Sequence, residues 1–209
     1  MKKIGIMGGT FNPIHIGHLM IAQRAYEEYH LDQVIFLPNG NPPHKAGDDV
    51  LDAAYRADMV KLAIRPHPEF VFSDFEIQNP CYSYTSDTLA HFCDQNPEAS
   101  YYFIVGADSL DYMDQWHEPQ EIFSRATILA AARGNLVLAG MEQKIRELEE
   151  KFHASIGLLH LPNVAISSNW IRKNVRDGFS IHYYVTDEVE AYIKEHNLYV
   201  SSSDQPAGR

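Results

Sequence analysis

The chain has 209 residues, of which 45% are apolar and 22% are charged, and both values are typical of one globular domain. Its 17 Lys and Arg against 28 Asp and Glu give a formal net charge of −11, which opposes binding to the backbone of a long nucleic acid. With two Cys and no apolar run long enough to span a membrane, we expect a cytoplasmic protein with neither a nucleic-acid nor a membrane partner.

The N-terminal part of the chain predicts a strand–helix–strand unit. Residues 3–7 and 33–38 are short apolar runs bounded by Gly or Pro, which is typical of buried parallel strands. Between them, residues 17–30 repeat apolar side chains every three or four positions, as one face of a helix does. Units of this kind build open α/β sheets.

The same alternation continues toward the C-terminus. The patterns predict further strands at 70–77, 101–105, 127–132 and 155–161, and helices at 52–64, 85–93, 140–152, 168–175 and 186–196. We therefore expect an α/β fold: a doubly wound, Rossmann-like, mostly parallel sheet with helices on both faces and a small C-terminal helical portion. Residues 1–199 should form a single domain, with the sheet core over 1–162, the helical portion over 163–199 and a flexible tail over 200–209.

A candidate phosphate-binding loop follows the first predicted strand, where residues 8–18 read GGTFNPIHIGH. Gly8 and Gly9 let the backbone approach a phosphate, and the start of the next helix presents free N–H groups. His15 and His18 are three residues apart, so both rings fall on the same side of the first helical turn and could donate to phosphate oxygens. The loop matches neither the GxGxxG nor the GxxxxGK[ST] pattern, so we predict a phosphate site of another type.

A second candidate anion site lies far along the chain, where residues 166–172 read ISSNWIR. Ser167, Ser168 and Asn169 are favourable helix N-cap residues, and Arg172 follows in the first helical turn. A helix N-terminus beside a guanidinium group suits a phosphate ligand.

Other polar residues follow predicted strands, at the edge where open parallel sheets bind ligands. Residues 42–45 read PPHK, and residues 106–108 read GAD. Asp108 can accept hydrogen bonds from ribose hydroxyls, and Trp116 offers a flat face to an aromatic base. Arg133 is another candidate for a nucleotide contact.

These segments together resemble a known family. Residues 15–18 read HIGH, the signature shared by nucleotidylyltransferases and class I aminoacyl-tRNA synthetases. The longer GGTFNPIHIGH resembles the GGTFDPxHxGH opening of bacterial nicotinate mononucleotide adenylyltransferases. ISSNWIR is similar to that family's ISSTxIR, and residues 82–88 (YSYTSDT) are similar to its SYTxDT.

The resemblance extends from Lys3 to Tyr199. The sequence departs from it at Asn12, Asn169 and His117, where the family usually has Asp, Thr and Tyr. A backbone contact at His117 would survive this change, whereas a side-chain role there does not carry over.

The resemblance implies transfer of AMP from ATP to nicotinate mononucleotide by direct in-line attack, which gives nicotinate adenine dinucleotide (deamido-NAD) and pyrophosphate in NAD biosynthesis. The expected catalytic residues are His15, His18 and Arg172, and the expected ATP-binding residues are Gly8, Gly9, Thr10, Phe11, His15, His18, Gly106, Ser167, Ser168 and Arg172. The expected mononucleotide-binding residues are Asn39, His44, Lys45, Thr85, Asp108, Trp116 and Arg133, with the backbone near Thr85 holding the nicotinate carboxylate. We expect Mg²⁺ to bind mainly through the ATP phosphates, with no dedicated protein metal site.

Several alternatives stay open. Nicotinamide mononucleotide or another phosphorylated acceptor would need the same chemistry, and the resemblance alone favours the acid over the amide. A catalytically inactive nucleotide sensor could share the fold, although the intact histidine pair and Arg172 argue against it. A class I synthetase is excluded, because the chain has no room for a tRNA-binding body. A homo-oligomer is compatible with the sequence.

Overall fold

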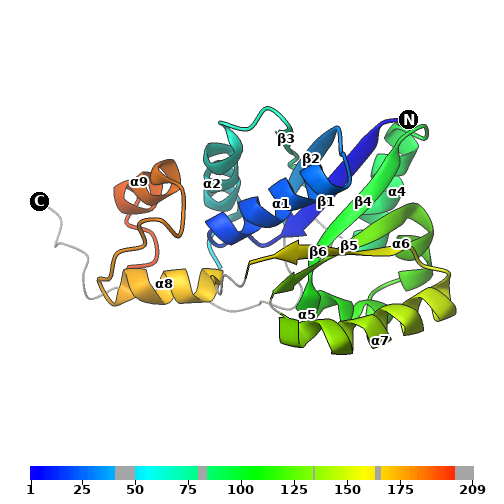
Figure 1. Cartoon of the computed structure of the whole chain (residues 1–209). Helices are drawn as coiled ribbons and strands as arrows, with labels where there is room; N and C mark the ends of the chain where they lie inside the picture. The colour runs from blue at the N-terminus through cyan, green and yellow to red at the C-terminus, as the bar shows by residue number, and fades with distance from the viewer. Residues whose placement is uncertain (41–49, 80–83, 134, 163–165, 201–209) are drawn as a thin grey trace, which may run out of the picture.

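The computed structural model describes residues 1–40, 50–79, 84–133, 135–162 and 166–200. Within these ranges, six parallel strands form one sheet with the order β3-β2-β1-β4-β5-β6 (Figure 1). The strands are β1 (Lys3–Gly9), β2 (Gln33–Pro38), β3 (Phe70–Phe72), β4 (Ser100–Gly106), β5 (Ala126–Arg133) and β6 (Ile156–Leu161). The predicted doubly wound sheet is confirmed, since the strand order turns back at the β1–β4 pair.

The strands are apolar throughout because both faces of the sheet are covered. In β2, Val34 and Phe36 belong to one buried cluster, whereas Ile35 and Leu37 belong to another, as the alternation of side chains along a strand requires. The first cluster is covered by α1 (Ile16–Glu28) and α2 (Ala53–Ile64), and the second by α4 (Thr85–Gln95), α6 (Pro119–Arg125) and α7 (Asn135–Phe152).

The predicted strand over residues 70–77 is only partly correct. The strand β3 ends at Phe72, and a short helix, α3 (Phe75–Gln78), follows. Ser73 and Asp74 cause the change, because short polar side chains favour helix starts over continued pairing. The Ser73 hydroxyl accepts a hydrogen bond from the Phe75 N–H at 3.4 Å.

The segment between β4 and β5 contains helices that the sequence patterns did not predict. These are α5 (Ala107–Leu110), the 3-10 turn η1 (Met113–Gln115) and α6. All three are too short to show a clear helical period. The predicted helix over 140–152 is real but begins five residues earlier, at Asn135, so Gly140 lies inside α7.

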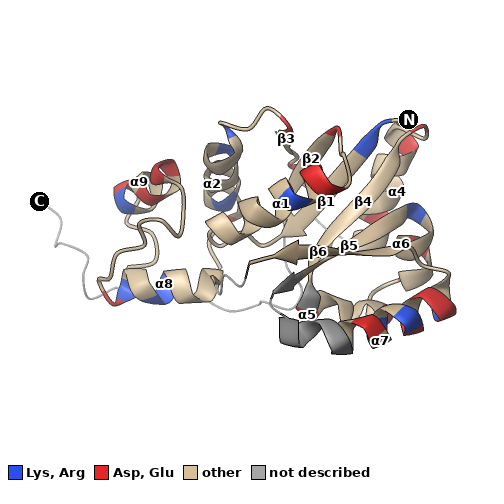
Figure 2. Ribbon diagram, in the orientation of Figure 1, with Lys and Arg blue, Asp and Glu red and all other residues tan. Residues whose placement is uncertain are grey.

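The C-terminal helices share the hydrophobic core of the sheet. They are α8 (Ser168–Arg176), which carries Lys173 and Arg176 in its last turn (Figure 2), and α9 (Asp187–Glu195). Ile171 of α8 and Val189 of α9 are fully buried in the same cluster as Phe36 of β2. The division into a sheet core and a helical portion within one domain stays a prediction.

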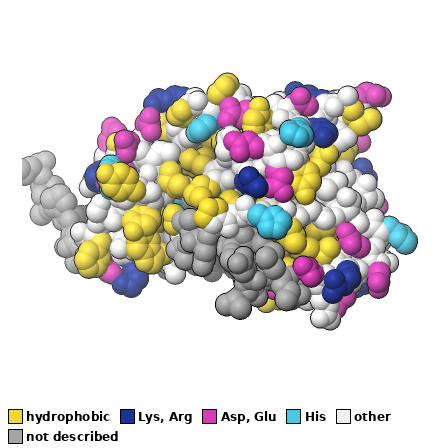
Figure 3. All heavy atoms as spheres, in the orientation of Figure 1, with side chains coloured by type: hydrophobic (Ala, Val, Ile, Leu, Met, Phe, Trp, Pro, Cys, Tyr) yellow, Lys and Arg dark blue, Asp and Glu magenta, His cyan; other side chains and the backbone are white. Residues whose placement is uncertain are grey.

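The surface carries mixed charges. Figure 3 shows acidic and basic side chains interspersed with hydrophobic ones on the face that it presents. Among the described residues, no helix is both long enough and apolar enough to cross a membrane.

Candidate functional site

A pocket of about 460 Å³ lies where β1 and β4 end, at the carboxyl edge of the sheet. It is lined by the loop after β1, the start of α1, one residue after β4 and the start of α8. The lining residues are Thr10, Asn12, His15, His18, Val50, Asp108, Ile166, Ser167, Ser168, Asn169 and Arg172. Open parallel sheets bind ligands at this edge, next to the point where the strand order turns back.

The two histidines of the loop form one stacked unit at the start of α1. Their ring centroids are 3.7 Å apart with an interplanar angle of 21°. The backbone N–H of His15 donates to Nδ1 of His18 at 3.2 Å. Because Nδ1 of His18 accepts this bond, the neutral ring carries its proton on Nε2, which is then the donor atom of the ring.

Two neighbours hold the histidine pair in place. A Cβ atom at Gly17 would lie 3.1 Å from the ring of His15, so a glycine here leaves space for the imidazole. Phe11 is 2% exposed, has a positive φ of 47° and packs edge-on against His18 with ring centroids 5.1 Å apart. The sequence GGTFNPIHIGH therefore places the histidine rings by local packing.

The start of α8 is bonded directly to the loop after β1. The Ser168 hydroxyl donates to the Pro13 carbonyl at 2.9 Å, and Nη1 of Arg172 donates to the Asn12 carbonyl at 2.9 Å. Ser167 caps α8, because its side chain accepts from the Trp170 N–H at 3.2 Å. Two segments about 160 residues apart thus meet at one pocket, with a helix N-terminus and a guanidinium group beside the histidines.

The described residues expected at the mononucleotide divide between this pocket, which Asp108 lines, and positions outside its lining. Asp108 is exposed and lines the pocket from α5. Asn39 follows β2, and its buried Oδ1 accepts no hydrogen bond within the described structure. This oxygen is therefore an acceptor available to a ligand.

A stacked aromatic pair connects Trp116 with the start of α4. The ring of His117 stacks on Tyr84, with centroids 4.0 Å apart, and Tyr84 directly precedes Thr85, the first residue of α4. Trp116 is half-buried and packs edge-on against Phe103 of β4. Thr85 and Trp116 are therefore each adjacent in sequence to one member of this stacked pair, and their shared ligand stays a prediction.

The structure brings together only part of the predicted site. Seven predicted residues line the pocket: Thr10, His15, His18, Asp108, Ser167, Ser168 and Arg172. Gly8, Gly9, Phe11, Asn39, Thr85, Gly106 and Trp116 do not line it, although Gly9 and Phe11 shape the loop. Arg133 ends β5, and its side chain lies outside the described structure, as do His44 and Lys45.

Four lining residues were absent from the predicted site: Asn12, Val50, Ile166 and Asn169. A fifth omission is Arg56, which is 1% exposed and donates to the Thr10 carbonyl at 2.8 Å. The sequence contains a pattern that could have identified Arg56, because this residue shares one face of α2 with the buried Met59, Val60 and Ala63. A charged side chain on the apolar stripe of a helix indicates a specific partner.

A buried carboxyl group lies behind the start of α4. Glu76 is 6% exposed and accepts a hydrogen bond from Thr88 Oγ1 at 2.8 Å. Burial raises the pKa of Glu76 to about 7, and the bond from Thr88 opposes this rise. The backbone carbonyl of Glu76 also lies so close to Gly40 that a Cβ there would clash at 2.3 Å.

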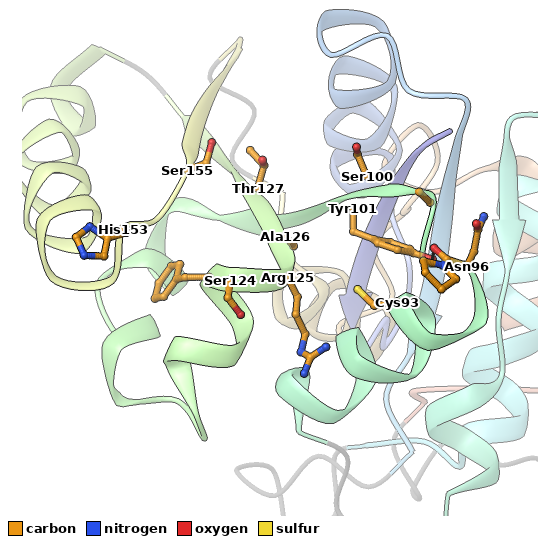
Figure 4. Close-up of a pocket in the computed structure, with 13 residues that line it drawn as sticks. Cys93, Asn96, Ser100, Tyr101, Ser124, Arg125, Ala126, Thr127, His153 and Ser155 are labelled. Atoms are coloured by element: carbon orange, nitrogen blue, oxygen red, sulfur yellow. Dashed lines mark hydrogen bonds between the residues drawn. The ribbon is translucent and has the colours of Figure 1, made fainter. Parts of the chain in front are cut away.

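A second hollow, of about 300 Å³, lies at the opposite, amino-terminal edge of the sheet (Figure 4). Ser100 and Ala126, which begin β4 and β5, line it. Its Arg125 is already paired with the Glu121 carboxylate at 2.8 Å, and burial raises the pKa of the Cys93 thiol. With its cation paired and its thiol protonated, this hollow is a poor site for phosphate chemistry.

One group of metal-binding side chains lies outside the pocket. Among the described residues, His182, Asp187 and Glu190 place one potential ligand atom each within 4.8 Å of one another. They already pair without an ion, since Nδ1 of His182 lies 2.8 Å from the Glu190 carboxylate, and Lys194 also contacts that carboxylate. None of them lines the pocket.

Comparison with known proteins agrees with this geometry. Residues 6–174 match a family model described as cytidylyltransferase-like. The chain is 42% identical over 200 residues to a protein of Lachnoclostridium phytofermentans described as "Probable nicotinate-nucleotide adenylyltransferase", covering 96% of this chain and all of that protein. A Clostridium novyi protein of the same description is 39% identical over 199 residues, covering 95% of this chain and all of that protein.

Solved structures support the fold. The nicotinic acid mononucleotide adenylyltransferase of Plasmodium falciparum, complexed with NaAD, aligns with a TM-score of 0.79 at 20% identity and covers 95% of this chain and 98% of that chain. The same enzyme complexed with APC aligns with a TM-score of 0.77 over the same shares of the two chains. The whole α/β architecture, including the C-terminal helices, is therefore shared.

Proposed function

Because the chain belongs to the nicotinate-nucleotide adenylyltransferases of the cytidylyltransferase-like family, we propose that the pocket at the end of β1 carries the adenylyl transfer. The enzyme transfers AMP from ATP to nicotinate mononucleotide and releases pyrophosphate, a step of NAD biosynthesis. The observation that carries this assignment is the bond from Arg172 to the Asn12 carbonyl, which joins the two predicted phosphate-binding segments at one pocket.

The reaction needs positioning rather than an activated side-chain nucleophile. An oxygen of the mononucleotide 5′-phosphate attacks the α-phosphorus of ATP, and the bond from this phosphorus to the α,β-bridging oxygen breaks. The attacking phosphate is already ionised near neutral pH, so no general base is required. Catalysis then comes from in-line alignment and from stabilising the negative charge that develops on the phosphoryl oxygens.

The side chains of the pocket suit these two tasks. We assign the donor on Nε2 of His18 to the reacting phosphoryl group, with His15 beside it on the ATP phosphates. Arg172 and the N-terminus of α8, capped by Ser167, would hold the departing pyrophosphate. Gly8, Gly9, Thr10 and Phe11 would shape the nucleotide loop.

Mg²⁺ fits this pocket as an ion held mainly by substrate. Asp108 is the single carboxylate among the described residues that line the pocket, which is too few for a protein-bound metal site. Asp108 stays a predicted ligand of the mononucleotide ribose. When bound, Mg²⁺ neutralises part of the triphosphate charge.

The acceptor would bind toward β2 and α4. The helix α4 begins at Thr85, and the positive end of its dipole would favour a carboxylate, which distinguishes nicotinate from its amide. Trp116 offers a ring face to the pyridine, and Asn39 Oδ1 an acceptor to a ribose hydroxyl. His44, Lys45 and Arg133 stay predictions for this side, as do the cytoplasmic location and a homo-oligomer.

A pyrophosphate-release assay with ATP and Mg²⁺ tests the function. We expect rapid release with nicotinate mononucleotide and much slower release with nicotinamide mononucleotide at equal concentrations. Faster release with nicotinamide mononucleotide would identify the amide, and not the acid, as the substrate. Tight ATP binding with no product from either acceptor would indicate a nucleotide sensor instead.

A further inference from the structure

Arg56 is a buried cation directly beneath the pocket. It lies on the core-facing side of α2 and is 1% exposed. Its guanidinium group donates four hydrogen bonds, all of them to backbone carbonyls: Nε to Leu51 at 2.9 Å, Nη1 to Thr10 at 2.8 Å, and Nη2 to Asn39 at 2.8 Å and Gly40 at 3.0 Å. Four of its five N–H donors are thus used on the main chain.

These carbonyls belong to three separate segments that surround the substrates. Thr10 is in the nucleotide loop and lines the pocket, and Leu51 directly follows Val50, another lining residue. Asn39 and Gly40 follow β2, on the acceptor side. Gly40 also packs closely against the Glu76 backbone carbonyl, so that an added Cβ atom would clash there. Arg56 therefore fixes the ATP side of the site relative to its acceptor side.

The charge of Arg56 is unusual for a core residue. It forms no ion pair with a carboxylate in the described part of the chain, and its hydrogen bonds end on neutral carbonyl oxygens. Burial lowers the pKa of this guanidinium group, although an arginine keeps its proton at neutral pH. An apolar side chain of similar length would fill the same space without the cost of burying a charge.

We propose that Arg56 is a positioning residue for adenylyl transfer: its planar fork sets the spacing between the nucleotide loop and the exit of β2, and its buried charge raises the positive potential behind the polyphosphate. This inference rests on the proposed function. A planar group with donors in fixed directions can hold three segments at once, whereas a lysine provides the charge without the fork. A misplacement of about 1 Å at a reacting group can slow a reaction about 100-fold.

Two variants separate the effect of the planar guanidinium geometry from the effect of the positive charge. Arg56→Lys keeps the charge, and Arg56→Met removes both features while filling the space. The matched control is Arg65→Met, at the exposed C-terminal end of the same helix, where Arg65 pairs with the Glu188 carboxylate at 3.4 Å. Each variant is measured well below its melting temperature, with circular dichroism and melting curves to establish the folded fraction.

We expect kcat per folded enzyme to fall about 10-fold or more in both Arg56 variants and to stay within twofold in the control. KM for ATP should rise clearly more in Arg56→Met than in Arg56→Lys, since only the first loses the charge. Calorimetric titration with α,β-methylene-ATP gives the same comparison without any acceptor. That readout stays valid if nicotinate mononucleotide proves to be the wrong substrate, so the two hypotheses can fail separately.

Chemical rescue adds a test that a purely stabilising role would not pass. In Arg56→Ala, millimolar guanidinium should restore part of the lost kcat, whereas urea, which is planar but neutral, should not. If Arg56→Ala does not fold, the Lys and Met variants carry the test. Folded Lys and Met variants with parental kcat, KM and analogue affinity would overturn the proposal and leave Arg56 with a role in stability only.

Discussion

At the residue scale, His18 is the side chain whose removal tests the chemistry most directly. The His15 N–H donates to Nδ1 of His18, which leaves Nε2 as the donor that we assign to the reacting phosphoryl group. We expect His18→Ala to lower kcat about 100- to 1000-fold at saturating ATP, as loss of one preorganised donor to a transition state does. Steady-state pyrophosphate release measures this fall in kcat. The exposed His160 provides the control variant His160→Ala. Near-normal turnover of His18→Ala would remove this histidine from the mechanism.

Glu76 predicts a dependence of stability on pH. Its pKa is about 7 in the folded protein, above the ordinary value of 4.5, so the folded state favours the protonated carboxyl. The stabilisation is fully present below about pH 4.5 and is lost as the pH rises through 7. Relative to Glu76→Gln, the parent should lose roughly 1–3 kcal/mol of unfolding free energy between pH 5 and 8.

Urea denaturation across this pH range measures the difference between the two proteins. Comparison with Glu76→Gln cancels the contributions of all other titratable groups, because the two proteins share them. The exposed Glu98 gives a control, Glu98→Gln, for which we expect no such trend. Parallel pH profiles for the parent and Glu76→Gln would show that Glu76 ionises normally.

At the element scale, the C-terminal end of the chain supports the nucleotide loop. The Tyr199 hydroxyl donates to Asn12 Oδ1 at 2.8 Å, and the Leu51 N–H reaches the same oxygen at 3.4 Å. The Asn12 carbonyl in turn accepts from Arg172 of α8. Asn at position 12 therefore serves as a neutral junction between the loop, α8 and the segment after α9.

We expect Tyr199→Phe to weaken this junction. The change removes one buried hydrogen bond, which should lower the unfolding free energy by about 1–2 kcal/mol and raise KM for ATP several-fold. Denaturant unfolding and steady-state kinetics measure the two effects. Tyr183, which is 82% exposed, provides the control Tyr183→Phe. Unchanged KM together with reduced stability would show that the C-terminal contact does not influence the site.

At the scale of the whole molecule, the pocket takes residues from both the sheet region and the C-terminal helices, and these regions share one hydrophobic core. ATP should therefore stabilise them together. At an ATP concentration about 100 times its Kd, we expect about 2.7 kcal/mol of added stability and a rise in Tm of roughly 5–10 °C.

Calorimetry should show one unfolding transition that shifts as a unit, with the same midpoint by circular dichroism. Arg172→Ala should reduce the shift produced by ATP, because it removes a pocket cation. Two transitions, of which ATP moves only one, would mean that the C-terminal helical portion is a separate domain.

The predictions from sequence succeeded where the controlling interactions are local. The strands were recognisable because burial on both faces selects uninterrupted apolar runs, as in β2. The loop with His15 and His18 was recognisable because its glycines, its helix start and its histidines are contiguous. The strand predicted over residues 70–77 was wrong after Phe72, where Ser73 and Asp74 favour a helix start over further pairing.

By itself, the amino-acid sequence determined the α/β class and predicted two candidate phosphate-binding segments, since both inferences depend on neighbouring residues. Only the tertiary structure decided that Arg172 bonds to Asn12 across 160 positions and Tyr199 to Asn12 across 187. It also decided that Arg56 links three loops. These contacts arise from the order of the strands and the packing of distant helices, which no local pattern of residues encodes.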